Sequence, residues 1–69
     1  MRIIASKQNE FGSKTFVMEK GGSVYMLETI GGVVPHSPNS PEVVFYKDFG
    51  DAWGGFAAAR AICAMRLHK

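Results

Sequence analysis

The sequence contains one cysteine, Cys63, so it cannot form an internal disulfide bond. No cluster of cysteine and histidine residues has the spacing of a zinc site, and we expect neither a metal nor a cofactor. A chain of 69 residues has a small core, which usually needs a disulfide, a metal or a partner to stabilise it. Association with another polypeptide is the stabilising device that remains, and the free thiol suits a reducing compartment.

Long apolar runs are also missing from the chain. The first residues, MRIIASKQNE, lack the apolar run of a signal peptide, and no stretch approaches the ~20 apolar residues of a membrane span. The net charge is only +2, and the basic residues are scattered. This mild charge permits contact with nucleic acid without pointing to it. We therefore expect an intracellular, cytoplasmic protein that does not contact a membrane.

The first two thirds of the sequence have the alternation of β-strands. Glycine pairs and short polar stretches separate the apolar segments, and Gly21-Gly22 has the form of a tight hairpin turn. Within this hairpin both faces carry apolar side chains, so one face is expected to take a helix and the other to be exposed in part. The predicted strands are Met1–Lys7, Lys14–Lys20, Ser23–Ile30 and Glu42–Lys47.

The segment at residues 33–41, VVPHSPNSP, predicts a loop. It contains three prolines, each of which lacks a backbone donor and fixes its own φ, so a strand within a sheet is not expected here. A loop of this length is often functional or mobile. Its histidine, His36, is a candidate recognition residue or general base, but no Ser/His/Asp order or paired-carboxylate motif surrounds it, and we interpret it as a surface residue.

The only segment with a convincing helical period runs from Asp48 to Leu67, and the helix is predicted at about residues 49–67. Asp48 or Asp51 is expected to cap its first amides. Gly54-Gly55 conflicts with a continuous helix, because each glycine costs roughly 1 kcal/mol relative to alanine. Either the first turn is separate, or the backbone approaches another group closely at this point.

This predicted helix is apolar on both sides. One face carries Ala52, Phe56, Ala59, Cys63 and Leu67, and we expect it to pack on the core. The opposite face carries no charge, and no acidic residue follows Asp51. Because a chain this short has nothing left to cover a second apolar side, we infer that this face meets another polypeptide. The expected interface residues are Trp53, Gly54, Ala57, Ala58, Ala61 and Met65.

Catalytic chemistry is not indicated. Cys63 is expected to be a small buried residue rather than a nucleophile, and His68 a solvated group at the helix end. The glycine pairs fit neither phosphate-binding pattern, GxxxxGK[ST] or GxGxxG. We therefore expect no enzyme, no catalytic residue and no cofactor-binding residue.

A nucleic-acid-binding module is the alternative interpretation. Strands can read bases through an exposed sheet face, and lysines occur on the predicted strands. Lysine on a strand edge also prevents aggregation, which makes the signal ambiguous. The residues that would contact nucleic acid are Lys14, Lys20 and Lys47.

The predicted fold is one α+β domain over residues 1–69, in which a small antiparallel sheet of three to four strands packs against one C-terminal helix. The helix contains the pattern F-x-x-A-W-x-x-F-x-x-A at Phe49, Ala52, Trp53, Phe56 and Ala59. In size, strand order and this helix, the chain resembles small phage-encoded inhibitors of the anti-CRISPR type. The resemblance implies a non-enzymatic inhibitor in the host cytoplasm, one that binds a larger target or homodimerises. Since the chain is mildly basic, it implies steric occlusion rather than nucleic-acid mimicry.

Overall fold

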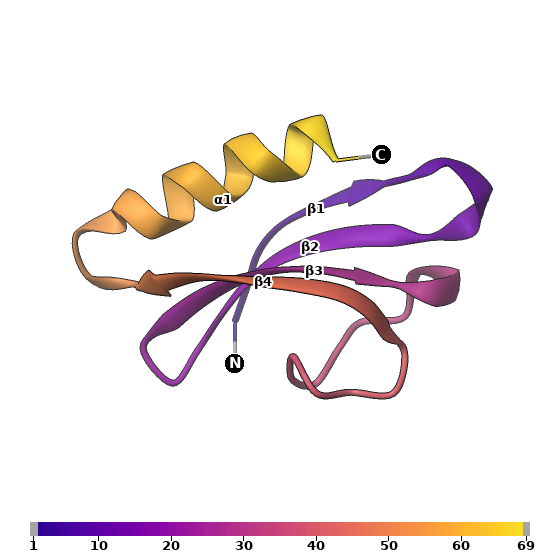
Figure 1. Cartoon of the computed structure of the whole chain (residues 1–69), viewed down its shortest axis with the longest axis horizontal. Coiled ribbons are helices and arrows are strands. Elements are labelled where there is room, and N and C mark those ends of the chain that lie inside the picture. Colours follow the sequence, from indigo (N-terminus) through magenta and orange to yellow (C-terminus); the bar gives the residue numbers. More distant parts are fainter. Residues whose placement is uncertain (1, 69) are drawn as a thin grey trace.

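The structure, a computed structural model that describes residues 2–68, is a four-stranded antiparallel sheet with one helix packed on it (Figure 1). The strands lie side by side in chain order, and the helix follows the last of them. This arrangement confirms the α+β fold that the sequence predicts. The elements are β1 (Arg2–Gln8), β2 (Lys14–Lys20), β3 (Ser23–Thr29), β4 (Val43–Asp51) and α1 (Phe56–Leu67).

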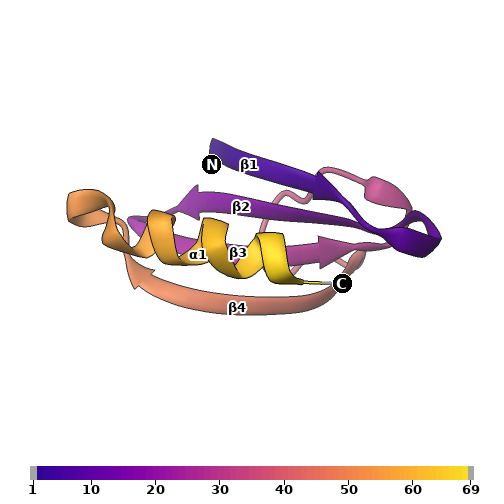
Figure 2. The ribbon, with the colours of Figure 1, turned by 90° about the horizontal axis from the view of Figure 1, so that it is seen from above.

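The core lies between α1 and one face of the sheet. Seen from above, α1 runs along the strands over the middle of the sheet (Figure 2). Alternation along β2 and β3 directs every second side chain toward the helix. Two helix alanines are among the buried residues, and their small side chains let the helix lie close to the sheet. The six buried core residues are Val17, Val24, Met26, Ala57, Ala61 and Met65.

The other face of the two central strands is covered as well, by the proline-rich loop that runs beneath the sheet (Figure 1). Phe16, Met18 and Leu27 alternate with the helix-facing residues and are at most 3% exposed, and Pro35 of the loop is itself fully buried. The Ser40 hydroxyl accepts hydrogen bonds from two loop amides and fixes the loop's shape. On β2 and β3 this second face is therefore buried at Phe16, Met18 and Leu27, while Tyr25 is half-buried and Lys20 exposed.

The helix begins later than predicted, because β4 continues to Asp51. Asp48 and Asp51 do not cap α1; their carboxylates accept hydrogen bonds from the amides of Gly50 and Trp53, at 2.7 and 2.8 Å. A separate helical turn, Trp53–Gly55, follows. Gly54 and Gly55 have φ angles of 82° and 78°, in the left-handed region that favours glycine. Of the two explanations for this glycine pair, the separate first turn is therefore correct.

Candidate functional site

The structure reverses the two predicted faces of α1. The face expected to bind a partner supplies Ala57, Ala61 and Met65 to the core, where each is at most 4% exposed. The face expected to pack inward points outward. We call this surface the outer seam and define it by Phe56, Ala59, Cys63 and Leu67, all of which are exposed.

The reversal has a physical reason. The sheet presents bulky side chains to the helix, so the remaining space takes alanine more readily than phenylalanine. The left-handed glycines also break the helical period, so that Ala52 and Trp53 do not continue either face of α1. The period of the sequence alone locates the two faces, and the positions of Arg60 and Arg66 beside the face of Phe56 are the signal that this face lies outside.

Two large apolar side chains are exposed at the outer seam. Phe56 is 76% exposed and Leu67 is 84% exposed, and they lie at opposite ends of α1. Between them lie the small side chains of Ala59 and Cys63. The spacing of these four residues, i, i+3, i+7 and i+11, places them along one stripe of the helix.

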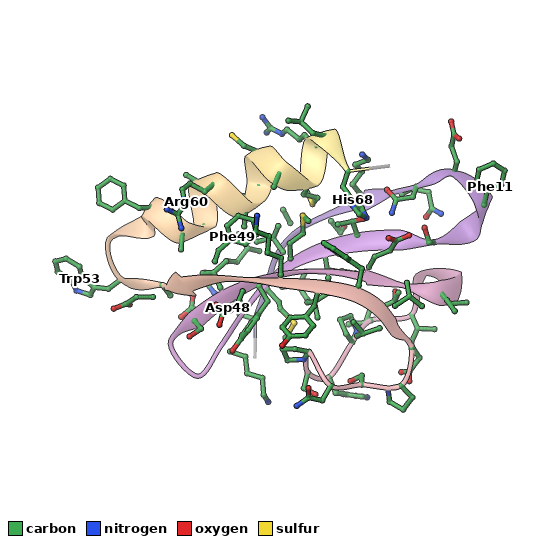
Figure 3. The ribbon with its side chains drawn as sticks, viewed as in Figure 1. Phe11, Asp48, Phe49, Trp53, Arg60 and His68 are labelled. Carbon is green, nitrogen blue, oxygen red and sulfur yellow. The ribbon has the colours of Figure 1, made fainter. Side chains whose placement is uncertain are left out.

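Trp53 extends the exposed apolar surface beyond the start of α1. It is 85% exposed and points away from the molecule at the end where β4 leads into the helix (Figure 3). A Cβ atom at Gly54 would lie 3.3 Å from the Phe56 ring, so a side chain at this position would crowd the ring and glycine does not. Two exposed aromatic residues, Trp53 in the turn and Phe56 at the start of α1, thus lie three positions apart.

The charges on this side of α1 are basic and flank the outer seam. On the helix wheel, Arg60 and Arg66 lie on opposite sides of it. The guanidinium of Arg60 donates a hydrogen bond of 3.0 Å to the carbonyl oxygen of Phe49, which draws this charge toward β4 (Figure 3). Arg66 is exposed in the last turn. The nearest acidic residue in the sequence, Asp51, precedes the helix.

The C-terminal end of α1 is tied to the sheet by contacts that the sequence did not reveal. The Lys7 ammonium group donates to the carbonyl oxygens of Met65, Arg66 and His68, at the helix end, where carbonyl groups lack the amide of a following turn. His68, expected to be solvated, lies 2.7 Å from Glu28 Oε1 and stacks on the Phe45 ring. Because the residues that make these contacts are far apart in the sequence, the contacts could not be predicted from it.

The same contacts explain why the pKa of the Glu28 carboxyl is shifted. The hydrogen bond with His68 lowers the pKa of Glu28 below its ordinary value of 4.5, and the Ser13 hydroxyl lowers it further. Burial opposes this shift without cancelling it. The ionised Glu28 carboxylate is thus stabilised by the same contact that holds the end of the helix against the sheet.

The three lysines of the nucleic-acid alternative do not share a surface. Lys14 and Lys20 lie at opposite ends of β2, on the side of the proline-rich loop. Lys47 lies on the helix side of β4, with its ammonium group 5.2 Å from the centre of the Phe49 ring. Because both faces of the central strands are covered, the open sheet face that this alternative requires is absent from them.

Within residues 2–68, no group of three or more histidine, cysteine, aspartate and glutamate side chains could hold a metal ion. Over the same range, no helix has both the length and the apolar character that a membrane crossing requires. The remaining expected interface residues are divided: Gly54 is exposed and Ala58 is half-buried. Of the residues predicted to form an interface, Trp53 has the most exposed side chain.

A comparison of the chain with protein-family models, with curated proteins and with solved structures found no match.

Proposed function

We propose that this protein is a non-enzymatic interaction domain that binds another polypeptide through Trp53 and the outer seam of α1. The observation that carries the proposal is the 85% exposure of Trp53 beside a helix surface whose largest side chains are also exposed. Tryptophan and other aromatic residues supply much of the binding energy at protein interfaces. A surface of this composition is typical of one that is covered in a complex.

The rigidity of the surface supports the same function. The outer seam lies on a helix whose inner side is buried and whose end is held by Lys7. Binding through a preformed helix avoids the conformational entropy cost of ordering a loop. The exposed aromatic residues are therefore held in position before a partner binds.

The proposal includes the inhibitor function that the resemblance implies. The bound partner would be a larger target, covered sterically by this domain in the host cytoplasm. The net charge of +2 favours occlusion over mimicry of a nucleic acid, which requires an acidic surface. The exposed, unpaired Cys63 is compatible with a reducing compartment.

The test is co-purification from the native cells with a tagged chain. We expect a partner, or a second copy of the chain, to be retained by the natural sequence and lost with Trp53→Glu or Phe56→Glu. The matched control is Ile30→Lys, which places a charge on a residue that is 64% exposed and lies outside α1. Equal retention by the natural chain and both glutamate variants would contradict the proposal.

A further inference from the structure

A cleft of about 350 Å³ lies on the side of the sheet where the proline-rich loop runs (Figure 1). This volume is within the range of ligand-binding sites in proteins. The strands β3 and β4 contribute Tyr25 and Tyr46 to its lining, and the loop contributes Pro38 and Asn39. Because the outer seam belongs to α1, on the other side of the sheet, the proposed function leaves this cleft unused.

The walls of the cleft are held in place by contacts within the chain. The rings of Tyr25 and Tyr46 pack together, with their centroids 6.2 Å apart and their planes tilted by 58°. In the loop, the Ser37 hydroxyl accepts a hydrogen bond from the backbone amide of Asn39, and the Ser37 carbonyl accepts one from the amide of Ser40. A ligand therefore meets a preformed site, which lowers the entropy cost of binding.

The two tyrosines offer an aromatic surface that the loop leaves partly open. Tyr46 is 51% exposed and Tyr25 is half-buried, and Pro38 adds a third rigid ring to the lining. Grooves lined by aromatic rings bind proline-rich segments in the polyproline II conformation. This conformation rises about 3.1 Å per residue, so two of its residues span the 6.2 Å between the ring centroids.

The polar groups of the cleft suit the backbone of such a segment. A polyproline II helix has no internal hydrogen bonds, so its carbonyl oxygens remain free acceptors. The tyrosine hydroxyls and the side-chain amide of Asn39 are donors of the kind that these oxygens require.

The charges that line the cleft are opposite in sign. Lys20 lies at the end of β2, and Asp48 lies on β4. The Asp48 carboxylate accepts a hydrogen bond of 2.7 Å from the Gly50 amide, which holds the negative charge beside the strand. A lining whose two charges cancel favours an uncharged ligand over one that carries phosphate groups.

From these observations we infer that the cleft binds an uncharged, proline-rich segment of another polypeptide in the polyproline II conformation. Its pyrrolidine rings pack on Tyr25 and Tyr46, and its carbonyl oxygens accept hydrogen bonds from the polar groups of the cleft. An uncharged sugar is the competing ligand for tyrosine rings flanked by polar groups. The spacing of the two rings and the presence of Pro38 favour the peptide.

The experiment is an NMR titration of the full chain, labelled with nitrogen-15, with decaproline. We expect the amide signals of the cleft residues to shift and saturate, with a dissociation constant between about 10 µM and about 1 mM. Tyr46→Ala should weaken binding about 10-fold or more, since it removes one of the two ring surfaces. Val44→Ala is the matched control and should bind normally, because Val44 is similarly exposed on the same strand and lies outside the cleft.

Two further arms make the test specific. A peptide of alternating glycine and serine, equal in length to decaproline, should cause no saturable shift, because it lacks pyrrolidine rings. Trp53→Glu should bind decaproline as the natural chain does, so this inference and the proposed function stand or fail separately. The dispersion of the amide signals shows whether each variant is folded.

Four results would overturn the inference. The first is the absence of a saturable shift up to about 5 mM decaproline, and the second is an equal response to the glycine–serine peptide. The third is unchanged binding by Tyr46→Ala. The fourth is a saturable shift with cellotetraose and none with decaproline, which would assign the cleft to a sugar.

Discussion

Phe11 lies in the connection between β1 and β2 with a φ angle of 64°, and within residues 2–68 it is the one residue other than glycine with a positive φ. Its side chain is fully exposed at the end of the molecule opposite Trp53 (Figure 3). No packing compensates for the left-handed conformation of a bulky residue. The position therefore carries strain without a contact that offsets it.

Phe11→Asn should raise the free energy of unfolding by about 1 kcal/mol, since asparagine tolerates the left-handed region better. Urea unfolding measures the change. Phe11→Ala is the matched control: it removes the same ring but lacks the polar side chain that stabilises asparagine in the left-handed region, so it should keep most of the strain. If asparagine and alanine change the stability equally, backbone strain is not the cause.

The pair of Glu28 and His68 makes stability depend on pH. Because the pKa of Glu28 is lowered in the folded state, the unfolded state binds more protons in the interval below 4.5. The contribution of this carboxyl is therefore complete above that pH and disappears as the pH falls through the folded-state pKa. Unfolding free energies between pH 6 and pH 3 should fall less steeply for Glu28→Gln than for the natural chain.

His68→Gln provides the second arm of this experiment. It removes the main cause of the lowered pKa while leaving the carboxyl in place. Its profile should lie between those of the natural chain and Glu28→Gln. An unchanged slope in both variants would show that the pair does not stabilise the folded state.

At the level of elements, substitutions on the two sides of α1 test which face of the helix lies inside. Ala61 is completely buried, whereas Ala59 is exposed on the outer seam two residues earlier. Ala61→Leu should lower the free energy of unfolding by about 1–3 kcal/mol, because the core has no room for three further carbons. Ala59→Leu should change it by less than about 0.5 kcal/mol.

Both variants carry the same substitution in the same helix, so helix propensity cancels between them. Thermal or urea unfolding at low micromolar concentration keeps association out of the comparison. Equal effects at the two positions would contradict the orientation of α1. The substitution Ala61→Arg, which the sequence alone would suggest as a probe of association, would instead disrupt the core.

The elements differ in how far the sequence could predict them. β2 was predicted with its observed ends, because its alternating pattern lies between short polar and glycine-rich stretches. β4 was predicted too short, since the aspartates at its end resemble helix caps but bind the amides of turns. The buried role of Pro35 was not predictable, because local preferences describe a loop's conformation and not the face on which it lies.

The candidate site shows the same limit. Phe56, Cys63 and Leu67 were recognised as one helical face, but were assigned to the core because bulky apolar residues are usually inside. Both helix faces are apolar, but Arg60 and Arg66 lie beside the face of Phe56, and these two charges are the signal in the sequence that this face is the outer one.

At the scale of the whole molecule, the two central strands are covered on one side by α1 and on the other by the proline-rich loop, whereas most of β4 is exposed. The exposed apolar surface that remains on the helix is a consequence of this arrangement. Burying the outer seam would add the stabilisation that a core of this size lacks. We therefore expect a bound partner to raise the unfolding temperature of the natural chain and to leave that of Phe56→Lys unchanged.

The most direct measurement of the central claim is the rate at which a thiol reagent modifies Cys63. The thiol is exposed in the isolated chain and lies in the middle of the outer seam. If a polypeptide covers this surface, labelling will be slower in concentrated protein or in native-cell extract than in dilute protein, and Phe56→Lys will abolish the difference. A rate that is equally fast in all three conditions would contradict the account.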